Sequence, residues 1–224
     1  MNIIFAVDPV HPPLTGIGRY TYELAAGLKS SPGIKTLRFF RHGQWVDRFD
    51  DSLKPGLSSS SFRTILSRSP IAVWAYGKIV PTISRSRLRK YENSLFHSPN
   101  FILQPFPGPS IATFHDLSVY RFPEFHPEAR INYMKREIPK ALRRADHFIA
   151  VSSFTAEEMQ NILDIPPEKI SIVYNGVSPA YHPRPYQELV RPLAKYNVQP
   201  GKDLLSVATL EPRKNLSTLI KVYE

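Results

Sequence analysis

The stretch NIIFAVDPVHPPLTGIGRYTYELAAGLKSSPGIKTLRFF, residues 2–40, contains a complete strand–helix–strand pattern. It begins with the short apolar run Asn2–Val7, which is typical of a strand covered on both faces. A loop with Pro and Gly follows, and apolar residues then recur at helical spacing through Gly18–Lys29. Lys35–Phe40 reads as a second strand. Two strands joined by a crossover helix form a βαβ unit, which predicts a parallel sheet.

The same alternation of strands and helices continues along the chain. We therefore predict an α/β fold with a Rossmann-like, doubly wound parallel sheet over residues 1–177. Residues 41–61 are polar and are predicted to form a loop. In the helix that follows Ser152, Thr155 and Glu158 fit a capping box. The further strands are predicted at Ser94–His97, Ser110–Phe114, His147–Val151 and Lys169–Tyr174, and a long helix at Pro127–Arg144.

The last part of the chain changes in character. Residues 178–202 are rich in Pro and predict a linker with one short helix, Tyr186–Tyr196. A strand at Asp203–Ala208 and a helix from about Leu216 would form the first βα unit of a second Rossmann-like domain, residues 203–224. A βα unit cannot bury its strand alone, so we expect the chain to be part of a longer protein.

Composition excludes several functional classes. The chain has 224 residues, no Cys, and 29 Lys+Arg against 19 Asp+Glu, which gives a net charge of +10. Without Cys there is no disulfide scaffold, iron–sulfur cluster, Cys-ligated zinc or thiol nucleophile. A hydrophobic content of 42% is too high for a disordered chain. The charge points to an anionic partner: an acidic membrane surface, a phosphorylated substrate or, ranked last because no recognised motif is present, nucleic acid.

No segment reads as a membrane helix or a signal peptide, so we expect a cytoplasmic protein. The longest uncharged stretch, residues 93–114, contains four prolines, which a membrane helix would not tolerate. Phe62–Tyr91 is a basic segment interleaved with Trp and aliphatic residues. It either docks on the inner face of a membrane or forms a core-packing helix pair with a solvated basic face. The cations assigned to the membrane-facing side are Arg85, Arg87, Arg89 and Lys90.

Unusual residues follow several of the predicted strands. In open parallel sheets, ligands bind beyond the carboxyl ends of the strands, so these residues are candidates for one site. They are Gly16 and Gly18 after the first strand, His115 and Asp116 after Ser110–Phe114, Ser153 after His147–Val151, Asn175 and Gly176 after Lys169–Tyr174, and Arg213 and Lys214 in the last unit.

Two of these features suggest anion binding. Gly16 and Gly18 precede a helix N-terminus, where free amides and the helix dipole suit an anion. They match neither a dinucleotide fingerprint nor a P-loop, and a simple tight turn is the alternative. Arg213 and Lys214 offer a planar fork and a point charge, which suit a diphosphate; the alternative is a solvated pair in a loop.

His115 is the candidate for direct contact with a substrate. A neutral imidazole at a strand end can hydrogen-bond a hydroxyl or a carbonyl group. Asp116 could orient it only if the chain turns there, because adjacent strand residues point to opposite faces. A structural histidine is the alternative. No pair of histidines has metal-ligand spacing, so we expect no metal.

Five segments together resemble a known family. In its order along the chain, the sequence resembles the GT-B-fold glycosyltransferases of glycosyltransferase family 4, and in particular bacterial mannosyltransferases that build O-antigen and exopolysaccharide. The segments that carry the resemblance are Thr15–Tyr20, Thr113–Leu117, Ala150–Thr155, Ile172–Val177 and Val207–Leu216.

The resemblance implies a retaining transferase that takes a hexose, with mannose as the first choice, from a nucleotide sugar such as GDP-mannose. The acceptor would be lipid-linked or a polysaccharide, and no metal would be required. By position, Arg213 and Lys214 match the diphosphate clamp, and Gly16 and Gly18 match the glycine loop at the donor phosphate. His115 matches the active-site histidine, with Asp116 beside it. The residues expected to line the acceptor side of the cleft are Arg19, Ser153, Asn175 and Gly176.

One family element, E-x₇-E in the donor-binding domain, would lie beyond Glu224. The resemblance therefore implies that these 224 residues alone do not catalyse transfer. A non-catalytic protein that binds membranes or anions is the alternative function.

Overall fold

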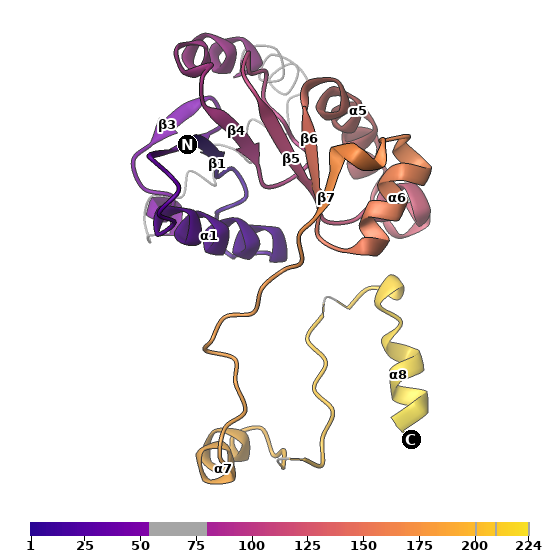
Figure 1. Cartoon of the computed structure of the whole chain (residues 1–224). Helices are drawn as coiled ribbons and strands as arrows, with labels where there is room; N and C mark the ends of the chain where they lie inside the picture. Colours follow the sequence, from indigo (N-terminus) through magenta and orange to yellow (C-terminus); the bar gives the residue numbers. More distant parts are fainter. Residues whose placement is uncertain (54–79, 200, 209, 224) are drawn as a thin grey trace.

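A computed structural model describes residues 1–53, 80–199, 201–208 and 210–223 (Figure 1). It confirms the predicted Rossmann-like α/β fold: seven strands form one sheet in the order β3-β2-β1-β4-β5-β6-β7. All neighbouring strands are parallel except β2 and β3. The strands are β1 (Asn2–Ala6), β2 (Thr36–Arg41), β3 (Gln44–Val46), β4 (Leu95–Ser98), β5 (Ser110–Phe114), β6 (His147–Ala150) and β7 (Ile170–Ile172).

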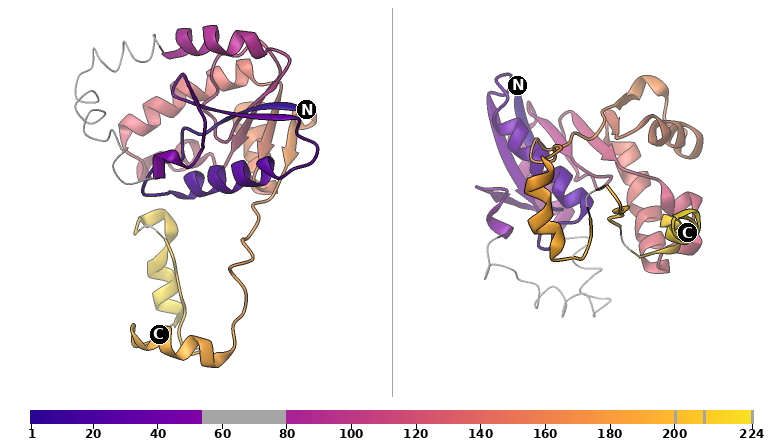
Figure 2. Two further views of the ribbon diagram at one scale, coloured as in Figure 1. Left: turned by 90° about the vertical axis from the view of Figure 1, so that its left-hand side faces the viewer. Right: turned by 90° about the horizontal axis from the view of Figure 1, so that it is seen from below.

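Helices cover both faces of the sheet, whereas the parallel strands β4 and β5 are joined by a loop without a helix, residues 99–109. In the left view of Figure 2, α1 lies below the sheet and the helical residues 80–88 lie above it. The α-helices are α1 (Gly16–Lys29), α4 (Ser118–Arg121), α5 (Glu128–Arg144), α6 (Ser153–Leu163), α7 (Tyr186–Ala194) and α8 (Leu216–Tyr223). The short 3-10 helices are η1 (Asp51–Leu53), η2 (Arg89–Tyr91), η3 (Pro123–Phe125), η4 (Pro167–Lys169) and η5 (Pro212–Lys214).

The central strand β1 shows why the sheet is buried on both sides. Ile3 and Phe5 belong to the core beneath α1, whereas Ile4 and Ala6 belong to the core on the other face. Successive side chains of a strand point to opposite faces. A strand covered on both sides therefore needs an unbroken apolar run, which the sequence supplies.

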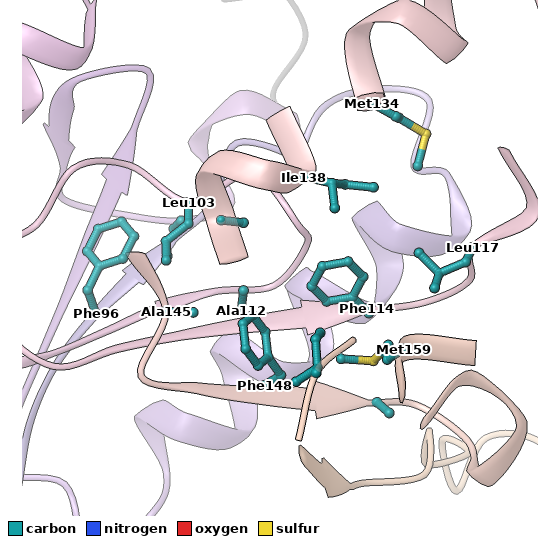
Figure 3. Packing of buried hydrophobic residues seen from close by; sticks show 14 of the residues in the cluster. Phe96, Leu103, Ala112, Phe114, Leu117, Met134, Ile138, Ala145, Phe148 and Met159 are labelled. Atoms are coloured by element: carbon teal, nitrogen blue, oxygen red, sulfur yellow. The ribbon is translucent and has the colours of Figure 1, made fainter. Parts of the chain in front are cut away.

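The core opposite α1 is the larger one (Figure 3). Phe114 of β5 and Phe148 of β6 meet edge to face, with 5.9 Å between their ring centroids. Ile138 of α5 and Met159 of α6 are fully buried in the same cluster. This packing fixes the positions of β5, β6 and the start of α6, whose ends carry several of the candidate site residues.

Part of the polar stretch predicted as a loop is an edge strand. His42 and Gly43 both have positive φ, at 48° and 81°, and form a two-residue turn that returns the chain antiparallel to β2. Trp45 of β3 then packs on Phe40, with 5.1 Å between the centroids, and on Tyr91 at 4.9 Å. The loop prediction is wrong here because one aromatic residue and a tight turn outweigh the polar composition of the segment.

The strand expected at residues 203–208 is not formed. These residues are extended and exposed, and no strand among the described residues pairs with them, so they lack the ladder that defines a strand. The predicted helices around them are confirmed as α7 and α8. After β7 the chain leaves the sheet through an extended segment (Figure 1).

The basic segment is described only from residue 80 onward; the rest of Phe62–Tyr91 lies outside the described residues. Its last helical turn buries Leu88 completely against the core, as the core-packing alternative requires. Arg85, Arg87, Arg89 and Lys90 are all exposed. No helix in the described part of the chain is long and apolar enough to cross a membrane.

Candidate functional site

The first turn of α1 begins at Gly16, two residues earlier than predicted. Thr15 is the N-cap, and its hydroxyl oxygen accepts a hydrogen bond from the Gly18 amide at 3.2 Å. The glycines therefore lie inside the helix and have different roles. A Cβ on Gly18 would lie 2.8 Å from the Pro9 carbonyl oxygen, whereas one on Gly16 would meet nothing within 4 Å. Gly18 allows close packing of the preceding loop, and Gly16 leaves the helix N-terminus open.

His115 follows β5 directly and lies at the carboxyl end of the sheet. Its Nε2 is 2.9 Å from the carbonyl oxygen of Pro99, which follows β4. A carbonyl oxygen only accepts, so Nε2 donates this bond. Burial lowers the pKa of His115, and the hydrogen bond to Pro99 and the charge of Asp116 oppose that shift only in part. The imidazole is therefore neutral at pH 7.

Asp116 begins α4. Its Oδ1 accepts hydrogen bonds from the backbone amide of Ser118 at 3.0 Å and from the Ser118 hydroxyl at 2.7 Å. The Nε2 of buried His126 lies 3.0 Å from the same hydroxyl oxygen. The charge of Asp116 opposes the lowering of the His115 pKa, and its carboxylate accepts the backbone amide at the first position of α4.

The N-terminus of α6 is linked to the His115 backbone. Ser152 is the N-cap, and its hydroxyl oxygen accepts from the Thr155 amide at 3.0 Å. The Thr155 hydroxyl donates to the carbonyl oxygen of His115 at 3.3 Å. The predicted capping box of Thr155 and Glu158 is wrong, because the helix begins at Ser153 and places Thr155 at the third helical position.

The start of α1 completes the cluster at this edge. The ring of Tyr20 packs edge to face on His115, with 4.7 Å between centroids and 86° between the ring planes. The structure thus brings together the helix turn that carries Gly16, Gly18 and Arg19, the His115 loop and the start of α6 at Ser153. Arg19 and Ser153 are exposed there.

The other predicted site residues lie elsewhere. Asn175 and Gly176 are exposed beyond β7, which is separated from β5 by β6 in the sheet. Lys214 is exposed in η5, and no hydrogen bond within the described residues joins it to His115. The side chain of Arg213 lies outside what the structure describes. The diphosphate clamp stays a prediction.

The chain matches a known protein family over most of its length. Residues 14–181, from the start of α1 to beyond β7, match the family model described as Glycosyltransferase Family 4. The chain belongs to glycosyltransferase family 4. The matched stretch of this family 4 chain includes the entire His115 cluster.

The chain is also similar to a known enzyme over its whole length. The chain is 32% identical over 228 residues to "O-antigen chain mannosyltransferase B" of Escherichia coli. The alignment covers 100% of this chain and 60% of that relative. The family 4 chain thus spans 60% of the length of the mannosyltransferase that it matches.

Sequence reasoning missed the residues that surround His115. Pro99 and Tyr20 belong to segments that are distant from His115 in the sequence, and nothing local marks them as its neighbours. Within the described residues, no group of three or more His, Cys, Asp or Glu could hold a metal ion. The expectation that the reaction needs no metal stays a prediction.

His97 is a buried histidine of the family 4 chain, and its lowered pKa makes stability depend on pH. Burial lowers its pKa from 6.5 to about 4. Between these values the unfolded chain binds a proton that the folded chain does not, so stability falls as pH falls from 6.5 towards 4. We expect wild type to lose about 3 kcal/mol of unfolding free energy over this range.

Urea unfolding at pH 7, 5.5 and 4.5 measures this loss. The variant His97→Gln should be less stable at pH 7 but should show a much shallower dependence on pH. A remaining slope is expected from His115, whose pKa is shifted in the same direction. If wild type and variant have parallel profiles, His97 is not the titrating group.

The α6 cap gives a second stability prediction. Ser152→Ala removes the acceptor of the Thr155 amide and should lower the unfolding free energy by about 1 kcal/mol. Ser153→Ala is the matched control, because Ser153 is exposed at the first helical position and should change stability little. Urea midpoints compare the two. Equal losses would show that Ser152 is not the cap.

Proposed function

We propose that the complete protein transfers a hexose, with mannose as the first candidate, from a nucleotide sugar to a lipid-linked or polysaccharide acceptor, with retention of configuration. Membership of the family supports glycosyl transfer, and the name of the relative supports mannose and cell-surface glycan. The single structural observation that carries the proposal is the His115 cluster. It places three groups at the carboxyl ends of the strands of one sheet: a neutral imidazole, the open N-terminus of α1 and the capped N-terminus of α6.

Each group has a chemical role in this proposal. The amides in the first turn of α1, beside the open position of Gly16, face the donor phosphate, where the helix dipole favours negative charge. Arg213 and Lys214 stabilise the charge that develops on the leaving diphosphate. His115 contacts the transferred sugar, which becomes oxocarbenium-like as its bond to the diphosphate breaks. GDP-mannose is the proposed donor, and nucleic acid is not a partner.

The test uses the complete gene product with GDP-mannose as donor and octyl α-mannoside as acceptor probe. We expect release of GDP together with a dimannoside, and NMR of the product should show the α-anomer retained. UDP-glucose and GDP-glucose serve as competing donors. Transfer from UDP-glucose or GDP-glucose in place of GDP-mannose would contradict mannose as the transferred sugar, but it would leave the transferase proposal standing. Binding of none of the donors would contradict the transferase proposal.

We propose further that the chain of residues 1–224 does not carry out this transfer by itself. The reason is that the relative extends well beyond the aligned region. The same assay, with the complete gene product as the positive control, checks this. Measurable dimannoside from residues 1–224 would contradict the proposal.

Membrane docking is the second candidate function, and the exposed cations of residues 85–90 support it. Arg87 also donates to the Gly43 carbonyl oxygen at 2.6 Å, which ties this surface to the β2–β3 turn. Vesicles containing anionic phospholipid should sediment the protein at low salt and release it at high salt. Neutralising Arg85, Arg87, Arg89 and Lys90 should abolish binding.

The matched control neutralises four exposed cations of α5: Arg130, Lys135, Arg136 and Arg143. If both variants lose vesicle binding equally, the binding depends on net charge and not on the cations of residues 85–90. The proposed location is the cytoplasmic face of a membrane.

A further inference from the structure

A continuous row of side chains joins the buried core beneath α1 to the imidazole of His115. Phe5 of β1 packs edge to face on His97, with 5.2 Å between the centroids. The Nε2 of His97 lies 2.9 Å from the Thr113 hydroxyl oxygen, and both residues are buried. The Thr113 side chain hydrogen-bonds the Tyr20 hydroxyl, and the Tyr20 ring contacts His115. The row spans four structural elements, so each member is held from a different direction.

The hydrogen bond to Pro99 decides which nitrogen of His115 carries the proton. The carbonyl oxygen can only accept, so Nε2 is protonated. Because the imidazole is neutral, Nδ1 then has a lone pair and no proton. None of the described residues hydrogen-bonds Nδ1. The nitrogen that the site leaves for a ligand is therefore an acceptor.

Tyr20 holds the plane of this imidazole. The edge-to-face contact fixes the ring from the side, while Pro99 fixes Nε2. The hydroxyl of Tyr20 is itself anchored. Burial raises the pKa of Tyr20, although the hydrogen bond from Thr113 opposes the shift, so the phenol is not ionised near pH 7. The backbone of Tyr20 is fixed by the first turn of α1, where Gly18 packs on the carbonyl of Pro9.

We propose that Tyr20 is a positioning residue which, together with the Pro99 carbonyl, holds His115 as the Nε2–H tautomer, so that Nδ1 accepts a hydrogen bond from a hydroxyl of the transferred sugar. This inference rests on the proposed function. As positive charge develops on the sugar, its hydroxyl groups become stronger donors, so the bond to Nδ1 strengthens in the transition state. A neutral acceptor also avoids the repulsion that an imidazolium would impose.

The tautomer is measured on residues 1–224 without any activity assay. Two-bond ¹H–¹⁵N spectra of histidine-labelled protein at pH 7.5, with His115 assigned from the His115→Gln variant, report the protonation of each ring nitrogen. We expect a protonated Nε2 and a bare Nδ1 in wild type and in Tyr20→Phe, which keeps the ring. Tyr20→Leu should show both tautomers.

Tyr22→Leu is the matched control on the same helix. Tyr22 packs on Phe49, away from His115, so its loss should leave the His115 pattern unchanged. A protonated Nδ1 in wild type would overturn the proposal even if Tyr20→Leu fails to fold. An unchanged pattern in folded Tyr20→Leu would overturn the role of Tyr20.

The acceptor role of Nδ1 is tested in the complete gene product. An Asn side chain places an oxygen near the position of Nδ1, whereas Gln places its polar end near Nε2. We expect His115→Asn to keep kcat within about tenfold of wild type, and His115→Gln to lose about a hundredfold. The reverse order would overturn the inference. If wild type transfers no sugar, the proposed function fails, while the tautomer spectra still decide whether Tyr20 positions His115.

Discussion

Replacing His115 by Ala in the complete gene product is expected to lower kcat for mannosyl transfer by about a hundredfold or more. The variant removes the imidazole at the carboxyl end of β5, and with it the acceptor that we propose for a hydroxyl of the transferred sugar. The loss should appear mainly in kcat, because the proposed hydrogen bond is strongest in the transition state. KM for the donor should change little, since the proposed diphosphate contacts, the first-turn amides of α1 with Arg213 and Lys214, remain in the variant.

The matched control is His147→Ala. His147 lies at the amino end of β6, at the opposite edge of the sheet, where its Nε2 is 2.9 Å from the Ser171 hydroxyl oxygen. This variant should transfer sugar at nearly the wild-type rate. Steady-state kinetics with GDP-mannose compare the two proteins. Equal kcat values for His115→Ala and wild type would exclude His115 from the chemistry, provided that circular dichroism shows both variants folded.

Replacing Gly108 by Ala is expected to lower the unfolding free energy by about 3 kcal/mol. A Cβ on Gly108 would overlap the carbonyl oxygen of Glu92 and lie 2.8 Å from the ring of Phe106. The carbonyl belongs to the backbone, so it cannot rotate away as a side chain could. The segment before β5 would have to shift, and with it the register of β5 against β4.

Gly27→Ala is the control for this substitution. Gly27 lies inside α1, where a new Cβ meets nothing within 4 Å, so the change should stabilise the helix by about 0.5–1 kcal/mol. Thermal unfolding of the two variants should therefore shift in opposite directions from wild type. A melting temperature for Gly108→Ala at or above that of wild type would contradict the predicted overlap.

The fold could be predicted from the sequence because its strongest signals are local. The apolar run of β1, the spacing of α1 and the strand Ser110–Phe114 are each set by neighbouring residues, and the structure has them within one or two positions. The boundaries that moved depend on caps. Thr15 and Ser152 each accept from an amide three residues ahead, and these bonds set where α1 and α6 begin.

The candidate site could be predicted only in part. Its place at the strand ends follows from the general rule for open parallel sheets, and His115 follows from its position after β5. The partners of His115 could not be predicted, because they depend on the register of strands. His97 pairs with Ile111 across β4 and β5, and this register sets its side chain beside Thr113. No local pattern encodes such a contact.

The order of the strands has a consequence for synthesis on the ribosome. β1 lies between β2 and β4, so one of its edges is paired by residues 36–40 and the other only by residues 95–97. At about 5–20 residues per second, several seconds of translation separate these two events. During that interval one edge of the apolar strand β1 is unpaired, and residues 2–6 can pair wrongly with another chain. Chaperone dependence of this protein should therefore arise early in translation and end once β4 has emerged.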